Sequence, residues 1–175
     1  PLIKKISLIS KPIIISTGLS TYKEVSESVS FIRSTNKIYN SDVFLCVLQC
    51  TSMYPIENSD ANLSVIQTYR KKLGVTPGYS DHTEGQKAVE FAYAMGAKVI
   101  EMHFTDSREN KSFRDHKVSF TKEEILDFIE RIKFIDELSG SPKKQPLKIE
   151  VDSGHVSSFR RAVYPKIDIK KGQKL

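Results

Sequence analysis

Long apolar runs and export signals are absent from this sequence of 175 residues. No apolar run approaches the length of about 18 residues that a membrane-spanning helix needs. The opening residues, PLIKKISLIS, form a short amphipathic stretch rather than a secretory signal peptide. They contain no initiator methionine, so we expect a fragment that begins within a helix. These absences argue against a membrane partner.

Cysteine is scarce, and its placement excludes a disulfide. Cys46 and Cys50 are the two cysteines, and both lie in the apolar run VFLCVLQC. On one strand, four residues separate them by about 13 Å, whereas a disulfide requires Cα atoms closer than about 7 Å. The same geometry excludes a metal site made by this cysteine pair. Two unpaired thiols fit a reducing compartment, and we expect a cytoplasmic protein.

Positive charge is present but not concentrated. The net charge is +6, and the lysines occur as pairs that are spread along the chain. Aromatic residues do not interleave them at a spacing that suits stacking on bases. We therefore expect solvated helix faces and no nucleic-acid partner, with a charge that helps to attract an anionic substrate.

Apolar runs alternate with amphipathic stretches along most of the chain. The expected strands cover 11–18, 42–50, 77–81 and 97–104, and the expected helices cover 20–36, 62–74, 83–96 and 121–140. Ser20 is the expected N-cap of the first of these helices, and Thr121 with Glu124 forms a capping box for the last. Gly74 and Gly140 are expected to end helices. Continuously apolar strands, each followed by a helix, are typical of a parallel sheet covered by helices.

Four strand–helix units fit two α/β folds. One is a doubly wound domain, and the other is half of a (β/α)8 TIM barrel, which needs about 250 residues when complete. We expect this domain to cover residues 1–140, followed by a polar linker with two prolines over residues 141–158. Residues 159–175 read as a strand and a charged turn, at the start of a second, small domain.

Polar residues follow each expected strand, at the end where parallel α/β folds carry their chemistry. His82 and His103 follow consecutive strands. Neighbouring strands lie about 4.8 Å apart, so the two imidazoles can reach one metal ion. Only two firm ligands leave open positions, which is typical of a catalytic Lewis acid. A structural role for each histidine is the alternative.

The neighbours of these histidines suggest orienting and phosphate-binding roles. Glu101 shares a strand face with His103, where it can orient a ligand or bond a substrate hydroxyl. The Ser16-Thr17-Gly18 turn and Ser80 place hydroxyl and N–H groups at strand-to-helix turns, which are typical phosphate sites. Helix capping is the alternative for the first of these turns.

Six motifs occur in order along nearly the whole chain: KPIIISTG, LQCTSMYP, NLSVI, GYSDHTEG, GAKVIEMHFT and DHKVS. Together they resemble the sialic acid synthase family, which comprises N-acetylneuraminate, legionaminate and pseudaminate synthases. PLIKK resembles the helix after the fourth strand of that family's barrel, and FRRAVYPKIDIKKGQKL resembles the start of its SAF (antifreeze-like) domain. The resemblance implies the C-terminal half of a (β/α)8 TIM barrel, followed by the first strand region of a SAF domain.

The resemblance also implies a transferase that condenses phosphoenolpyruvate (PEP) with N-acetylmannosamine or a related acylated amino sugar. The products would be a nonulosonic (sialic-type) acid and phosphate. A divalent cation, most often Mn²⁺ with Mg²⁺ or Co²⁺ as substitutes, would be held by His82 and His103 beside Glu101. In the implied homodimer, the SAF domain caps the partner's site.

Further residues are assigned to the substrates by the same resemblance. Ser16 and Ser80 would hold PEP, with Thr17 in the same turn, Ser52 and Tyr54 would line the substrate site, and Asp115 would contact the sugar. The family usually has Gly-Pro before the Asp-His pair, whereas this chain has Phe113-Arg114, and this difference bears on which sugar is used.

Two other interpretations stay open. Another PEP-condensing barrel, of the kind that makes 3-deoxy sugar acids, would use arginine and lysine phosphate clamps and a cysteine metal ligand. A non-enzymatic interpretation is an inactive or interacting fragment. Product analysis with different aldoses separates the two enzymes.

Overall fold

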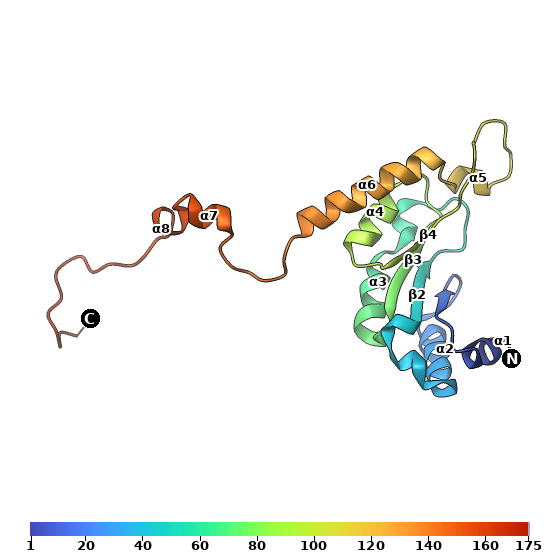
Figure 1. Cartoon of the computed structure of the whole chain (residues 1–175), viewed down its shortest axis with the longest axis horizontal. Helices are drawn as coiled ribbons and strands as arrows, with labels where there is room; N and C mark the ends of the chain where they lie inside the picture. Colours follow the sequence, from blue (N-terminus) through green and yellow to red (C-terminus); the bar gives the residue numbers. More distant parts are fainter. Residues whose placement is uncertain (175) are drawn as a thin grey trace. The chain divides into compact units, whose positions relative to one another are not determined.

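The structure is a computed structural model that describes residues 1–174. The chain forms two compact units, of which the first is Pro1–Leu138 and the second begins at Ser139. All the strands that the structure describes lie in the first unit (Figure 1).

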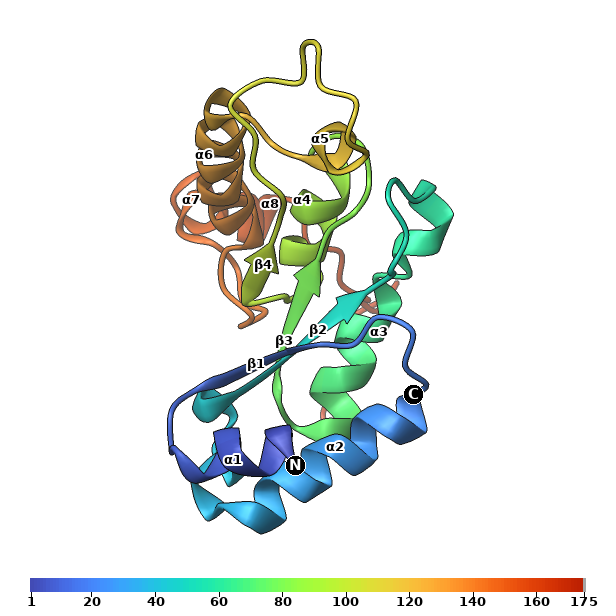
Figure 2. The same cartoon turned by 90° about the vertical axis from the view of Figure 1, so that its right-hand side faces the viewer.

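The first unit alternates strands and helices in chain order. Its strands are β1 (Ile13–Ser16), β2 (Leu45–Cys50), β3 (Thr76–Ser80) and β4 (Val99–Glu101). The α-helices that begin in this part of the chain are α1 (Leu2–Leu8), α2 (Tyr22–Thr35), α3 (Ser64–Thr68), α4 (Lys87–Ala94), α5 (Asp115–Val118) and α6 (Lys122–Ser139). The strands pair in parallel in the order β1-β2-β3-β4 (Figure 2).

One face of this sheet, which we call the outer face, packs against the helices. Val47 and Tyr79 are fully buried on it. Val47 belongs to a cluster with Val25 and Ile32 of α2, and Tyr79 belongs to a second cluster with Val89 of α4. Burial of apolar side chains between sheet and helices is the main force that stabilises this layer.

The opposite face, which we call the inner face, carries the alternate residues of each strand. Register pairs Cys50 with Ser80 and Ser80 with Glu101, so these side chains lie on one side of the sheet. Ser16 lies on the same side, and so does Ile14, which is 58% exposed. The inner face thus becomes polar toward the carboxyl ends of the strands.

The predicted alternation of strands and helices is confirmed, but several boundaries differ. The strand expected over 97–104 is limited to β4. Ser20 does not cap α2: its N–H donates to the Thr17 carbonyl in a turn, and Thr21 is the N-cap. The Thr21 hydroxyl accepts from the Glu24 N–H, and the Glu24 carboxylate accepts from the Thr21 N–H, which completes a capping box.

Predicted helix ends agree more closely with the structure. Thr121 and Glu124 form the expected capping box at the start of α6. Gly74 and Gly140 have φ values of +57° and +54°, the left-handed conformation that ends a helix with least strain in glycine. The helix expected over 62–74 changes after Thr68 from α-helix to a π-helical turn, Tyr69–Leu73.

The second unit departs from the prediction. Two short helices, α7 (Lys148–Asp152) and α8 (His155–Ser158), lie in the segment expected to be a linker. Residues 159–174 contain no strand, so the strand predicted within 159–175 is wrong for the described residues, and Leu175 lies outside them. A strand needs a neighbour for its hydrogen bonds, and this unit, as far as it is described, contains no other strand.

Among the described residues, no helix combines the length and apolarity that crossing a bilayer demands.

Candidate active site

The two histidines predicted from the strand ends lie side by side. The ring centroids of His82 and His103 are 5.3 Å apart. Tyr54, from the loop after β2, packs on both, with ring centroids 4.0 Å from His82 and 5.5 Å from His103. This confirms that the ends of β3 and β4 bring the imidazoles together, and it adds an aromatic wall.

His82 is anchored by backbone groups. Its Nδ1 lies 2.7 Å from the carbonyl oxygen of Thr51, and its own carbonyl accepts from the N–H of Ile56. Because a carbonyl can only accept, Nδ1 carries the proton of the neutral ring, and Nε2 keeps its lone pair. Burial lowers the pKa of His82, but contacts with Cys50 and Thr51 outweigh it and leave the pKa above its ordinary value.

Asp81, next to His82, is a buried carboxylate that shapes the turn. Its Oδ1 accepts from the Tyr79 hydroxyl at 3.0 Å and from the Thr83 N–H at 3.0 Å. The Thr83 hydroxyl donates to the same oxygen at 2.9 Å. Burial raises the pKa of Asp81 in spite of these donors. The carboxylate holds residues 81–83 in a turn, so the helix expected from 83 begins only at Lys87.

His103 is held more loosely, by the chain that follows it. Its carbonyl accepts from the Phe120 N–H, and its Nδ1 lies 3.9 Å from Asp115 Oδ2. Asp115 begins α5, and the preceding Arg114 lies with its guanidinium carbon 4.9 Å from the Tyr54 ring centroid. The predicted sugar residue Asp115 is therefore beside the histidines.

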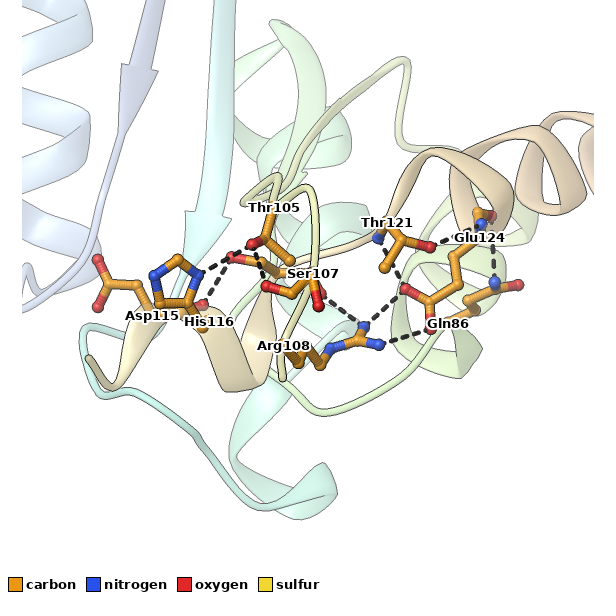
Figure 3. Close-up of polar contacts among 9 residues, drawn as sticks. Gln86, Thr105, Ser107, Arg108, Asp115, His116, Thr121 and Glu124 are labelled. Carbon is orange, nitrogen blue, oxygen red and sulfur yellow. Dashed lines mark hydrogen bonds and ion pairs between the residues drawn. The ribbon is translucent and has the colours of Figure 1, made fainter. Parts of the chain in front are cut away.

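Residues 105–119 form a hydrogen-bonded segment that carries Asp115 (Figure 3), and Arg114 precedes Asp115 in the same segment. Arg108 donates to both carboxylate oxygens of Glu124, at 3.0 and 2.6 Å, and to the Ser119 carbonyl. Thr105 donates to the Ser107 carbonyl at 2.7 Å. The Arg108 contact lowers the pKa of Glu124, so the pair is ionised at neutral pH. The loop is thus tied to the start of α6.

Ser80 and Glu101 form a second polar group on the inner face. Ser80 Oγ donates to Glu101 Oε1 at 2.7 Å. Glu101 lies on the predicted face, but its described contact is with Ser80 rather than with His103. Cys50 lies between this group and His82: burial raises the pKa of its thiol, but hydrogen bonds with His82, Ser16 and Ser80 outweigh burial and lower the pKa overall.

Two of the predicted substrate residues differ in their surroundings. The Thr17 hydroxyl donates to the Leu48 carbonyl at 2.7 Å and pairs with the Tyr69 hydroxyl at 2.9 Å. Its side chain is buried on the other side of the sheet from Ser16, with both hydroxyl contacts inside the protein, and its substrate role stays a prediction. Ser52 is exposed, and its hydroxyl packs closely against Gly18. A Cβ atom at position 18 would overlap the Ser52 hydroxyl.

Several residues at the site escaped the sequence analysis. The sequence predicts no site role for Cys50, although strand alternation with Ser80 places it on the inner face. Arg114 enters the sequence prediction only as a departure from a family motif. Arg108 and its partner Glu124 carry no local signal that they meet, because their contact spans the loop.

The donor set fits a divalent cation. Both imidazoles are at strand ends, and Nε2 of His82 keeps a lone pair. Asp115 Oδ1 is buried and accepts no hydrogen bond, although Arg114 lies nearby. Among the described residues no three His, Cys, Asp or Glu side chains converge as a complete set of ligands. The residues therefore fit an open site, in which water or substrate supplies further ligands.

The histidines and hydroxyls lie at the carboxyl ends of parallel strands, where (β/α) barrels carry their active sites. The chain belongs to the NeuB family, whose model matches residues 1–144. It is 34% identical over 174 residues to N,N'-diacetyllegionaminic acid synthase of Campylobacter jejuni, which covers 99% of this chain and 50% of that protein. It is 31% identical over 176 residues to N-acetylneuraminate-9-phosphate synthase of Mus musculus, covering 100% of this chain and 46% of that protein.

A solved structure shows the same arrangement of elements. N-acetylneuraminic acid (sialic acid) synthetase from Leptospira borgpetersenii matches with a TM-score of 0.79 and 28% identity, over 91% of this chain and 54% of that one. The sheet is therefore a parallel half-barrel of the sialic acid synthase type. The chain spans about half the length of the curated relatives that it matches.

Proposed function

We propose that this chain supplies the paired-histidine half of a nonulosonic acid synthase active site. The enzyme condenses PEP with N-acetylmannosamine or a related acylated amino sugar and releases phosphate. The observation that carries the proposal is the contact of His82, His103 and Tyr54 at adjacent strand ends. The relatives support it, because their names include legionaminic acid and neuraminate synthases.

Three polar inner-face residues, Ser16, Ser80 and Glu101, have roles in this reaction. Ser16 and Ser80 hold the phosphate of PEP, and binding turns the Ser80 hydroxyl away from Glu101, to which it donates in the free site. Glu101 then accepts a hydrogen bond from a substrate hydroxyl or from water. The carbon–carbon bond forms when carbon 3 of PEP attacks the aldehyde carbon of the open-chain sugar. Water adds at carbon 2, and phosphate leaves with cleavage of its bond to that carbon.

His82 and His103 would hold the divalent cation, with Mn²⁺ the first choice and Mg²⁺ or Co²⁺ as substitutes. When bound, the cation supplies Lewis acidity to the sugar aldehyde. The Thr51 carbonyl keeps the His82 ring in the tautomer and orientation that a ligand needs. Tyr54 closes one side of the site, and Asp115 bonds a sugar hydroxyl.

The assembly belongs to the proposal as well. We propose a cytoplasmic homodimer in which a SAF domain of the partner caps the site. Sedimentation of the purified protein tests the dimer independently of activity.

The decisive experiment uses the protein encoded by the complete reading frame that contains this chain. PEP, N-acetylmannosamine and Mn²⁺ are supplied, and phosphate release and the mass of the organic product are followed together. A nonulosonic acid formed in step with phosphate is expected, with loss on chelation and recovery on adding Mn²⁺. Turnover with simple aldose phosphates in place of amino sugars would instead support a 3-deoxy sugar acid synthase.

A further inference from the structure

Arg114 places a full positive charge at the edge of the candidate site. Its guanidinium carbon lies 4.9 Å from the Tyr54 ring centroid, and that ring is 4.0 Å from the ring of His82. One aromatic side chain therefore separates the guanidinium from the proposed metal ligand. A cation over an aromatic face is attracted to it, which holds the guanidinium in place.

The backbone that presents Arg114 is well ordered by hydrogen bonds. The Arg114 carbonyl accepts from the Lys117 N–H, and the Asp115 carbonyl accepts from the Ser119 hydroxyl at 2.7 Å. Ser119 in turn is held by Arg108, whose guanidinium is clamped on Glu124 (Figure 3). Arg114 is thus presented from a preorganised loop, which lowers the entropy lost when a ligand binds.

The guanidinium of Arg114 has spare donor capacity. Its nearest carboxylate is Asp115, with Nε 3.5 Å from Oδ1, an ion pair without hydrogen-bond geometry. Within residues 1–174 the Arg114 guanidinium makes no hydrogen bond, and the ion pair with Asp115 is its only polar contact. Arginine carries five N–H donors in a planar fork that matches phosphate and carboxylate oxygens. The Arg114 guanidinium therefore has N–H donors available for an anionic group of a ligand in the candidate site.

We propose that Arg114 binds an anionic group on the acceptor sugar, with phosphate as the best match, so that the acceptor is an acylated amino sugar phosphate. This rests on the proposed function. PEP also carries phosphate, but its proposed partners Ser16 and Ser80 belong to the strand-end group beside Glu101. Arg114 instead contacts Asp115, which is proposed to bond a sugar hydroxyl, and Tyr54, which closes one side of the site.

The test compares two acceptors in the protein from the complete reading frame. N-acetylmannosamine 6-phosphate and N-acetylmannosamine compete, and kcat/KM is measured for each, together with the KM for PEP. The expected preference for the phosphorylated sugar is at least about tenfold, the scale of one charge-assisted hydrogen bond. Arg114→Gln is expected to lower kcat/KM for the phosphorylated sugar at least about tenfold more than for the neutral one, and Arg114→Lys is expected to retain part of the preference.

A matched control removes the same charge elsewhere. Arg70 lines a hollow with Thr76 and Lys98 at the amino ends of the strands, away from the site, and Arg70→Gln is expected to change neither preference nor PEP affinity. Equal use of both sugars by the unsubstituted protein overturns the proposal. So does an equal loss for both sugars in Arg114→Gln, which means a packing role on Tyr54, or a selective rise in the KM for PEP.

Binding separates this proposal from the proposed function. If no acceptor is turned over, the synthase assignment fails, and calorimetric titration with the same two sugars still tests Arg114. The phosphorylated sugar is expected to bind at least about tenfold more tightly than the neutral one, with the difference lost in Arg114→Gln. Equal binding, or binding of neither sugar, overturns the assignment to Arg114.

Discussion

The outer and inner faces of the sheet are made from alternate residues of the same four strands, and they differ in character. Val47 and Tyr79 on the outer face are fully buried under helices. Ser80 and Glu101 on the inner face bond to each other, and Ile14 is 58% exposed. A period of two along each strand thus separates the face that packs against helices from the face that carries the polar strand ends.

The inner face is itself divided along the strand direction. Ile14 lies toward the start of β1, where a barrel interior is filled by apolar side chains, whereas Ser16 lies at its carboxyl end. Opposing strands would cover the apolar part and leave the polar end open to substrate. The division explains why an apolar residue can be exposed in this half-barrel while polar neighbours are paired.

The largest expected effect comes from expressing residues 1–175 without the opposing strands that would cover the inner face. Residues 1–175 expressed alone should aggregate or fold poorly and show no turnover, because β1 and β4 leave open edges and the inner face lacks opposing strands. A thermal melt with size-exclusion chromatography and the PEP assay measures this. A cooperative monomeric melt with turnover would favour a doubly wound single domain.

Loss of either histidine should come next in size. In the complete protein, His82→Ala or His103→Ala should lower kcat/KM by about 10³-fold or more, because a cation site worth several kcal/mol is broken. Circular dichroism should show a fold close to that of the unsubstituted protein. Full activity of either variant at any Mn²⁺ concentration would exclude that residue as a ligand.

Truncation on the outer face should change stability instead of specificity. Leu45→Ala should lower the free energy of unfolding by about 2–5 kcal/mol, because Leu45 is fully buried against helices. Ile14→Ala provides the matched test on the inner face. In the complete protein it should approach the same cost if opposing strands bury Ile14, and a cost below about 0.5 kcal/mol would indicate an open sheet.

Hydroxyl removal on the inner face should act on one substrate. Ser16→Ala and Ser80→Ala should each raise the KM for PEP more than the KM for the sugar. The lost binding free energy should be about 1.5–3 kcal/mol, the contribution of one hydrogen bond to a charged group. Steady-state kinetics with each substrate varied in turn measures this. Thr17→Ser is a control, because it keeps the hydroxyl that bonds Leu48. Equal effects on both substrates would contradict the assignment.

The smallest expected effect is a pH dependence from Asp81, whose neighbours Tyr79 and Thr83 lie with it in the buried turn. Burial raises its pKa in the folded protein above the unfolded value of about 3.9. The folded state then binds more protons between these two pKa values, so its stability falls as pH rises through that window. Asp81→Asn keeps the oxygen that accepts from Tyr79 and Thr83 and should remove this slope.

Thermal melts of the unsubstituted protein and of Asp81→Asn, recorded from about pH 4 upward, measure the difference in pH dependence. The series starts there because the carboxyl of an unfolded aspartate has a pKa of about 3.9. Parallel curves for the two proteins would show that Asp81 does not titrate as burial requires. Asp81→Ala should destabilise the protein at every pH, because it leaves the Tyr79 hydroxyl and the Thr83 N–H without a buried acceptor.

Much of the fold was predictable from periodicity. Apolar runs identified the four strands, and the Thr121–Glu124 pair located the start of α6, because both signals are local. Boundaries were less predictable where side chains bond their own backbone. Thr21 displaced Ser20 as N-cap, and Asp81 delayed the start of α4, since a local hydrogen bond competes with the next helical turn.

The sequence by itself determined where the four strands lie, the alternation of faces and the meeting of His82 with His103, because a parallel sheet brings consecutive strand ends together. Tertiary structure alone decided the surroundings of that pair. The Thr51 carbonyl bonds His82, and Arg114 lies over Tyr54, so each contact joins residues of two different loops. Such contacts leave no periodic trace, because they depend on how loops of irregular backbone pack above the sheet.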